Sequence, residues 1–192
     1  MRIPYVPNPP PTNGPEEEAI VARVRARRAP RDFLSLDLAL LHSPPVTDGW
    51  GAFLGAIRGR TSLPADIREI AISRAALILE AWMEWDAHTS ILAATPEFQT
   101  DTEAKLAVVG RDSTEEGPGP LNEEQWAVLR YADAMTRDVQ VSDEIFEALR
   151  KAGLDNQAIV EVTATVAAYN CVGRFLVALD VGERNGHRPA NL

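Results

Sequence analysis

Residues 80–89, EAWMEWDAHT, gather side chains that could move protons. Two tryptophans, three acids and one of the chain's three histidines fall within these ten positions. Glu84 and His88 are four residues apart, so on a helix they lie on one face and within reach of each other. A carboxylate beside an imidazole favours the protonated ring and raises its pKa, which suits a proton donor near neutral pH.

A second glutamate, Glu69, precedes Glu84 by fifteen residues. In one straight helix about four turns would separate the two, which is too far for joint chemistry. A chain reversal near 79–82 would instead bring Glu69 back against His88, and the sequence leaves both arrangements open. It also leaves open an ordinary surface ion pair of Glu84 and His88, which would stabilise the helix by only ~0.3–0.5 kcal/mol. Trp82 and Trp85 would then be aromatic residues of the core or of an interface.

Other catalytic patterns are weaker. Glu84 and His88 supply two ligands where zinc commonly needs three or four, so no metal site is predicted. The single cysteine, Cys171, cannot form an intrachain disulfide, and its apolar surroundings predict an inert buried thiol. No Walker loop, GxSxG or GxGxxG occurs in a suitable context, and no cofactor is expected. Arg74 and Arg174 lie in apolar segments, where each needs either a buried acid or a substrate carboxylate.

The composition is that of a soluble globular protein, with 192 residues of which 45% are apolar and 24% charged. Its 28 acids and 19 bases give a net charge of -9. A chain of this sign gains nothing from counterion release on a phosphate backbone, which argues against nucleic acid and anionic membrane as partners. No signal-peptide pattern and no segment of transmembrane length is expected, and one cysteine suits a reducing compartment, so the expected location is cytoplasmic.

The elements that must position these residues are all expected to be helices, because no strand-like alternation occurs. Residues 1–16 hold six prolines and predict an extended arm, either disordered or lying across a neighbouring subunit. Residues 17–192 are expected to form one domain, with a loop at 110–120. The expected helices cover 16–28, 33–43, 48–59, 64–82, 83–95, 122–138, 142–153 and 155–182.

Two segments, 68–89 and 127–181, resemble the carboxymuconolactone decarboxylase family, which includes the AhpD-type alkylhydroperoxidases. The likeness covers roughly residues 33–183 and leaves the proline-rich arm outside. It implies an all-α, AhpD-like helical bundle that assembles into a homo-oligomer, a trimer or a hexamer.

The peroxidase branch of this family has a glutamate, then a CxxC pair, then a histidine four residues after the second cysteine. Glu69 and His88 match the outer positions, whereas the two cysteine positions fall on Ala81 and Glu84. A disulfide cycle cannot run without thiols, so a peroxidase is not expected. The decarboxylase-like branch carries an acid–aromatic pair before the histidine, which Glu84 and Trp85 resemble.

The resemblance therefore implies a cofactor-independent lyase, or an isomerase, that acts on a small unsaturated lactone or cyclic carboxylic acid. His88 is the expected proton donor, oriented by Glu69 and Glu84. The alternative is a catalytically silent helical oligomer that binds a small ligand or a protein partner. Glu69 and His88 converging within hydrogen-bond reach of an enclosed cavity would favour the enzyme. Side chains that point to solvent, or a pocket packed shut by Trp82 and Trp85, would favour the alternative. The candidate substrate-binding residues are Trp82, Trp85, Arg74, Asn170 and Arg174.

Overall fold

The computed structural model describes residues 1–190 and 192, so position 191 of the expected domain lies outside the described residues. The described chain is all-α and contains no strand, as the sequence predicts. A short 3₁₀ turn, η1 (Pro96–Phe98), links two of the helices. The helices are α1 (Pro15–Arg28), α2 (Ser35–Leu40), α3 (Pro44–Gly59), α4 (Ala65–Ile78), α5 (Trp82–Ala93), α6 (Thr102–Val109), α7 (Glu123–Arg137), α8 (Asp143–Lys151) and α9 (Asn156–Leu179).

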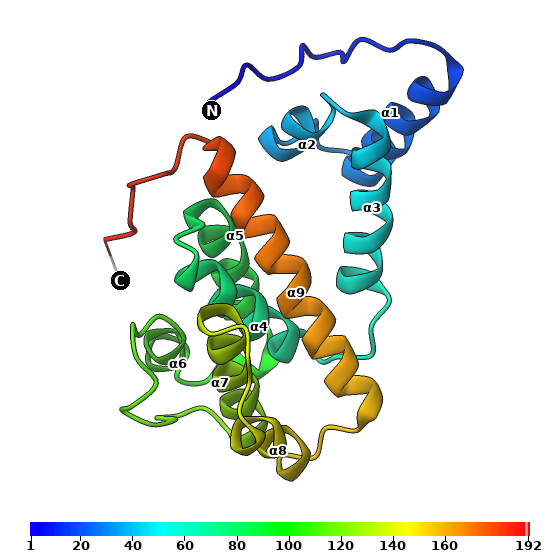
Figure 1. Ribbon diagram of the computed structural model, residues 1–192. Coiled ribbons are helices and arrows are strands. Elements are labelled where there is room, and N and C mark those ends of the chain that lie inside the picture. The colour runs from blue at the N-terminus through cyan, green and yellow to red at the C-terminus, as the bar shows by residue number, and fades with distance from the viewer. Residues whose placement is uncertain (191) are drawn as a thin grey trace.

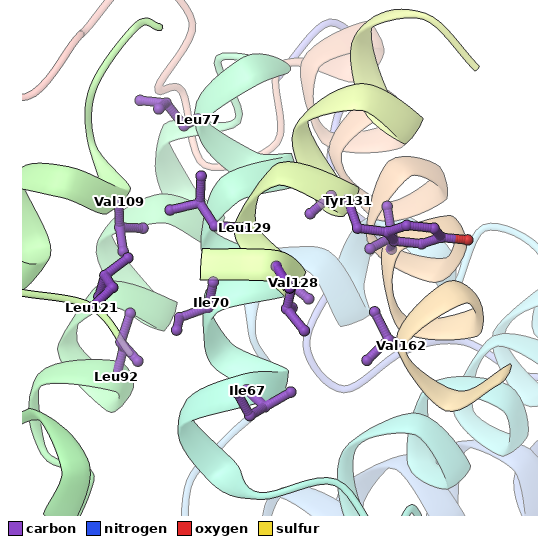
Figure 2. Packing of buried hydrophobic residues seen from close by; sticks show 14 of the residues in the cluster. Ile67, Ile70, Leu77, Leu92, Val109, Leu121, Val128, Leu129, Tyr131 and Val162 are labelled. Carbon is purple, nitrogen blue, oxygen red and sulfur yellow. The ribbon is translucent and has the colours of Figure 1, made fainter. Parts of the chain in front are cut away.

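Helix α4 is the centre of the core. Helices α5, α7 and α9 pack directly against it (Figure 1), and nearly every one of its side chains is buried. Because α4 is buried on nearly all sides, its polar side chains, such as Glu69 and Arg74, are buried as well and need partners inside the fold. Figure 2 shows Ile67 and Ile70 of α4 in one cluster with Val128 and Leu129 of α7 and Val162 of α9.

Side-chain caps fix the starts of the last three helices. Asn122 and Gln125 form a capping box at the start of α7, in which each side chain accepts a hydrogen bond from the other's backbone N–H. Ser142 caps α8 and Asp155 caps α9 in the same way as Asn122 caps α7. Gly153, which follows α8, has a φ of +97°. These boundaries agree with the sequence prediction.

Helices α1, α2 and α3 form a separate layer on the other side of α9 from α4 (Figure 1). The layer meets the core where α3 contacts α9. Pro44 was expected to stop a helix, and it also starts one, because proline suits the first turn, where an N–H has no intrahelical partner. Helix α3 is therefore longer than the expected 48–59. Helix α6 was not anticipated.

The proline-rich arm is extended and lies on its own chain. The Arg2 N–H donates to the Leu179 carbonyl at 2.8 Å, at the end of α9, and the Val6 N–H donates to the Leu38 carbonyl at 3.3 Å, in α2. The Tyr5 hydroxyl accepts from the Gly182 N–H at 2.8 Å. These bonds hold the arm across one side of the α1–α3 layer.

Helix α9 is long and apolar enough to cross a membrane by length and composition alone, so the expectation that no segment reaches that length was wrong. In the fold, 44% of its most apolar window is buried. Helix α9 packs against α3, α4 and α7. A helix with neighbours on several sides is expected to be rich in apolar residues.

Candidate active site

A tight reversal between α4 and α5 decides whether Glu69 and His88 can meet. The Ala81 N–H donates to the Ala76 carbonyl and the Glu80 N–H to the Leu77 carbonyl, at 2.9 and 3.0 Å. These two bonds form a Schellman motif, with Glu80 in the left-handed region at a φ of +53°. Helix α5 starts directly afterwards and runs back along α4. The chain therefore turns near 79–82, the second of the two arrangements that the sequence left open.

The reversal brings Glu69, Glu84 and His88 together as a buried triad. His88 Nδ1 lies 2.6 Å from Glu69 Oε2, and His88 Nε2 lies 3.0 Å from Glu84 Oε2. The exposed fraction is 2% for His88 and 3% for Glu69. The ordinary surface pair of Glu84 and His88, which the sequence also left open, does not describe this arrangement.

The two carboxylates determine the charge of the ring. Burial is the largest influence and by itself lowers the pKa of His88, but the hydrogen bonds and charges of Glu69 and Glu84 act in the opposite direction and leave that pKa above its ordinary value. Both ring nitrogens face carboxylates, and only the imidazolium donates from both. His88 is thus a protonated relay between two acids.

A cavity of about 420 Å³ lies between the α1–α3 layer and the core. Glu84 lines it, whereas His88 and Glu69 lie behind Glu84. Glu84 is therefore the member of the triad through which a proton can pass to a molecule in the cavity. The rest of the wall combines apolar side chains with three arginines and an aspartate: Leu36, Leu40, Trp50, Leu54, Val172, Arg27, Arg28, Arg58 and Asp37.

Tyr169 and Arg58 also line this cavity, and the sequence analysis did not single them out. The Tyr169 ring meets the His88 ring edge-on, with centroids 5.0 Å apart and an interplanar angle of 82°. Burial raises the pKa of Tyr169 far above its ordinary value, so its hydroxyl stays protonated. The available signal was one phenol in the apolar run TVAAYNCVG, which by itself fits a core aromatic equally well.

Trp82 and Trp85 lie in the hydrophobic core, at 3% and 4% exposed. Neither lines the 420 Å³ cavity, so neither closes it. Trp85 lines a second cavity, of about 620 Å³, together with Arg111 and Arg188. No triad residue borders that larger cavity. The smaller cavity is therefore the candidate site.

Arg74 is fully buried and is already occupied by its own chain. Its Nε donates to Asp133 at 2.8 Å, its Nη2 also bonds Asp133, and its Nη1 donates to the Val109 carbonyl at 3.0 Å and to the Arg111 carbonyl. Of the two partners considered for Arg74, the structure supplies the buried acid. These bonds join α4 to α7 and to the loop after α6.

Asn170 and Arg174 lie on a different face of α9 from Tyr169. The Asn170 amide donates to Thr136 of α7 at 2.9 Å and to the Val166 carbonyl at 3.0 Å, and Arg174 is exposed and bonds Asn170. Neither residue lines the candidate site. Cys171 is also exposed on α9, so the prediction of a buried thiol was wrong.

Within residues 1–190 and 192, no group of three His, Cys, Asp or Glu side chains is arranged to hold a metal ion. Glu69 and Glu84 instead direct one oxygen each at the ring nitrogens of His88. The arrangement is suited to holding and passing a proton.

Three solved structures share this architecture. The "alkylhydroperoxidase AhpD core" structure of an uncharacterized peroxidase-related protein from Ralstonia eutropha JMP134 aligns with a TM-score of 0.69 and 18% identity, over 85% of this chain and 84% of that one. The chain has the AhpD-like fold. A peroxidase-related protein from Silicibacter sp. TM1040 aligns with a TM-score of 0.63 and 18% identity, over 79% of this chain and 78% of the other.

The third structure is a protein of unknown function from Agrobacterium tumefaciens, proposed to be an AhpD antioxidant defence protein. It aligns with a TM-score of 0.60 and 22% identity, over 72% of this chain and 90% of that one. No family model matches the chain, and no curated protein matches it. At these identities the likeness establishes the AhpD-like fold.

Proposed function

We propose that the chain is a cofactor-independent lyase that decarboxylates a small unsaturated lactone or cyclic carboxylic acid. The observation that carries this proposal is the relay of Glu69, His88 and Glu84, which ends at the wall of the 420 Å³ cavity. A cavity of this volume suits a small organic acid. Through Glu84, the relay can deliver a proton to an acid bound in this cavity.

The reaction that fits this relay breaks one carbon–carbon bond and forms one carbon–hydrogen bond. Electrons from the departing CO2 move through a conjugated double bond into a carbonyl of the substrate, which gives a dienolate. His88 passes its proton to Glu84 across 3.0 Å as Glu84 delivers a proton to carbon, and Glu69 stabilises the imidazolium before that transfer. Solvent restores the proton, and no electron acceptor is consumed.

This assignment modifies the role of His88. The sequence analysis made it the direct proton donor, whereas Glu84 is the residue at the cavity wall. We therefore assign proton delivery to Glu84 and proton supply to His88. An isomerase would use the same two residues, taking a proton from one carbon and returning it to another.

The names of the structural neighbours point to peroxidase chemistry, which in the AhpD pattern needs two thiols. This chain has one cysteine, and Cys171 is exposed on α9 and does not line the candidate site. A redox-neutral reaction is therefore the better proposal. The silent-binder alternative is disfavoured because Glu69 and His88 meet at 2.6 Å beside a cavity that the tryptophans leave open.

We also propose that the chain acts as a cytoplasmic homo-oligomer, a trimer or a hexamer, with a small carboxylic acid as its ligand. One face of α9 supports the oligomer, because apolar side chains point outward there. Val160 is 65% exposed, and Ala167 and Cys171, about two and three turns farther along the same helix, are exposed as well. A core helix with an uncovered apolar face is a common contact between subunits.

The test is CO2 release from carboxymuconolactone and related unsaturated lactone acids. Glu84→Gln and His88→Gln should each lower kcat by about 10²- to 10⁴-fold, the usual contribution of a positioned acid or base. Glu147→Gln and His187→Gln, outside the candidate site, are the matched controls and should leave the rate unchanged. Circular dichroism and light scattering verify folding and assembly. Equal rates in Glu84→Gln and Glu147→Gln, or no CO2 from any acid, would contradict the proposal.

A further inference from the structure

The candidate site contains positive charge that the proposed proton relay does not use. Asp37 is buried and is matched by Arg28, whose Nε and Nη2 donate to it at 2.7 and 2.9 Å. Arg27 lies farther from the same carboxylate, at 3.6 Å. Arg58 forms no ion pair within 4.0 Å with any residue that the structure describes. Arg58, and to a lesser degree Arg27, are therefore surplus cations at the cavity wall.

Tyr169 adds an unused donor at the same wall. The residue is 3% exposed, yet its hydroxyl forms no hydrogen bond with the described part of the chain, whereas the comparable hydroxyl of Tyr131 bonds Thr163 at 2.9 Å. The hydroxyl is not fully enclosed by protein, so it is open to the cavity that Tyr169 lines. A ligand oxygen in the cavity can therefore accept a hydrogen bond from it.

Charge connects Tyr169 with Arg58. Burial raises the pKa of Tyr169, and the positive charge of Arg58 is the strongest effect opposing that rise, ahead of those from other charged groups. Both side chains line the same cavity, so an anionic group bound there can interact with both. Glu84 lines the same cavity, and the centroid of the Tyr169 ring lies 5.0 Å from that of the His88 ring, so Tyr169 is close to the proton relay.

The glycines of α3 leave room for such a group. Gly55 and Gly59 line the cavity, and a Cβ placed at either would meet nothing within 4 Å. A Cβ at Gly51 would lie 2.2 Å from the Arg27 guanidinium, so this glycine lets Arg27 lie against α3. Glycine is less favourable than alanine inside a helix. The cavity volume beside Arg58 is thus kept free at some cost in helix stability.

We infer that Tyr169 and Arg58 form an anion-binding subsite that holds a carboxylate of the ligand beside Glu84. The guanidinium supplies charge and paired donors, and the phenol supplies a neutral donor on the side of the relay. The subsite selects small planar acids over their neutral amides or esters. The inference rests on the proposed active site, but it concerns ligand binding, which can be measured without turnover.

The test is calorimetric titration of Glu84→Gln protein, in which turnover should be at least about 10²-fold slower, with benzoate, 2-furoate and trans,trans-muconate as probes. Benzamide is the neutral counterpart of benzoate. At least one carboxylate should bind, and benzamide should bind at least about 10-fold more weakly, because an ion pair with hydrogen bonds is lost. Adding Arg58→Gln should weaken carboxylate binding by about 10- to 100-fold, and Tyr169→Phe by about 2- to 10-fold.

Arg60→Gln is the matched control, because Arg60 follows Arg58 closely but does not line the cavity. Three results would overturn the subsite: no binding by any carboxylate, equal binding of benzoate and benzamide, or equal effects of Arg58→Gln and Arg60→Gln. Carboxylate binding that depends on Arg58, in a wild-type protein that releases no CO2, supports the subsite and contradicts only the lyase. CO2 release with a KM that Arg58→Gln leaves unchanged supports the lyase and contradicts only the subsite.

Discussion

Replacing Glu69 with glutamine should weaken the buried triad in a way that depends on pH. Glutamine keeps an oxygen that can accept from His88 Nδ1, now 2.6 Å from Glu69, but removes the negative charge. The second carboxylate, Glu84, remains 3.0 Å from Nε2. The substitution therefore tests the charge of one partner and leaves the shape of the site nearly unchanged.

The sign of the pH dependence follows from the raised pKa of His88. The folded protein binds this proton more tightly than the unfolded chain, whose histidines titrate near pH 6.5. The resulting stabilisation is fully present below that value and is lost as the pH rises through the raised pKa of the folded state. Between these two pKa values the folded state holds up to one more proton than the unfolded state. The free energy of unfolding therefore falls by at most about 1.4 kcal/mol for each unit by which the pH rises.

The magnitude follows from the hydrogen bond that changes. A bond to a charged group contributes about 1.5–3 kcal/mol and one between neutral groups about 0.5–1.5 kcal/mol. Glu69→Gln should therefore lower the free energy of unfolding by about 1–2 kcal/mol at pH 6. The difference should shrink once the pH has risen past the raised pKa of His88.

Urea denaturation at several pH values, analysed as a double-mutant cycle with His88→Gln, measures this coupling. The cycle removes contributions from other groups, such as Glu183, whose pKa is lowered by a hydrogen bond from the amino terminus. A coupling between Glu69 and His88 that is absent at pH 6, or that grows toward high pH, would refute the assignment of an imidazolium between two carboxylates.

The other predictions concern residues outside the relay. Arg74→Met should lower the free energy of unfolding by about 3–5 kcal/mol, because Asp133 and two carbonyls lose a buried partner; urea denaturation measures the loss, and carboxylate binding by the folded fraction should persist. Cys171→Ser should change stability by less than about 0.5 kcal/mol and leave CO2 release unchanged, since the thiol is exposed. Val160→Glu should reduce the mass of the proposed oligomer in light scattering, and an unchanged mass would place the interface elsewhere.

Much of the fold could be predicted from local sequence. The starts of α7, α8 and α9 carry caps at Asn122, Ser142 and Asp155 that act within three residues, so neighbouring residues suffice to place them. The end of α4 was ambiguous for a physical reason. Glycine usually takes the left-handed position of a Schellman motif, and Glu80 takes it here. A continuous helix over 64–82 was therefore a reasonable expectation.

Only the pairing of Glu84 with His88 could be predicted from local sequence, and the third member of the triad could not. Glu84 and His88 lie on one helix, and their spacing alone brings them together. Glu69 depends on the reversal at Glu80, which sequence spacing cannot establish. The substrate-binding predictions depended still more on tertiary structure. Arg74 and Arg58 are both arginines near apolar segments, but packing places one against Asp133 and leaves the other facing a cavity.

The kind of chemistry depends on the side chain at position 84. The helical backbone of α5 fixes where this side chain lies relative to His88, four residues on, whichever residue occupies it. A thiol there, paired with another at position 81, could give up two electrons to a peroxide and form a disulfide. A carboxylate with Ala81 beside it cannot supply electrons, but it can hold a proton and exchange it with the imidazole at 3.0 Å. Introducing a thiol by Glu84→Cys should therefore abolish proton delivery without producing peroxidase activity, because position 81 has no sulfur.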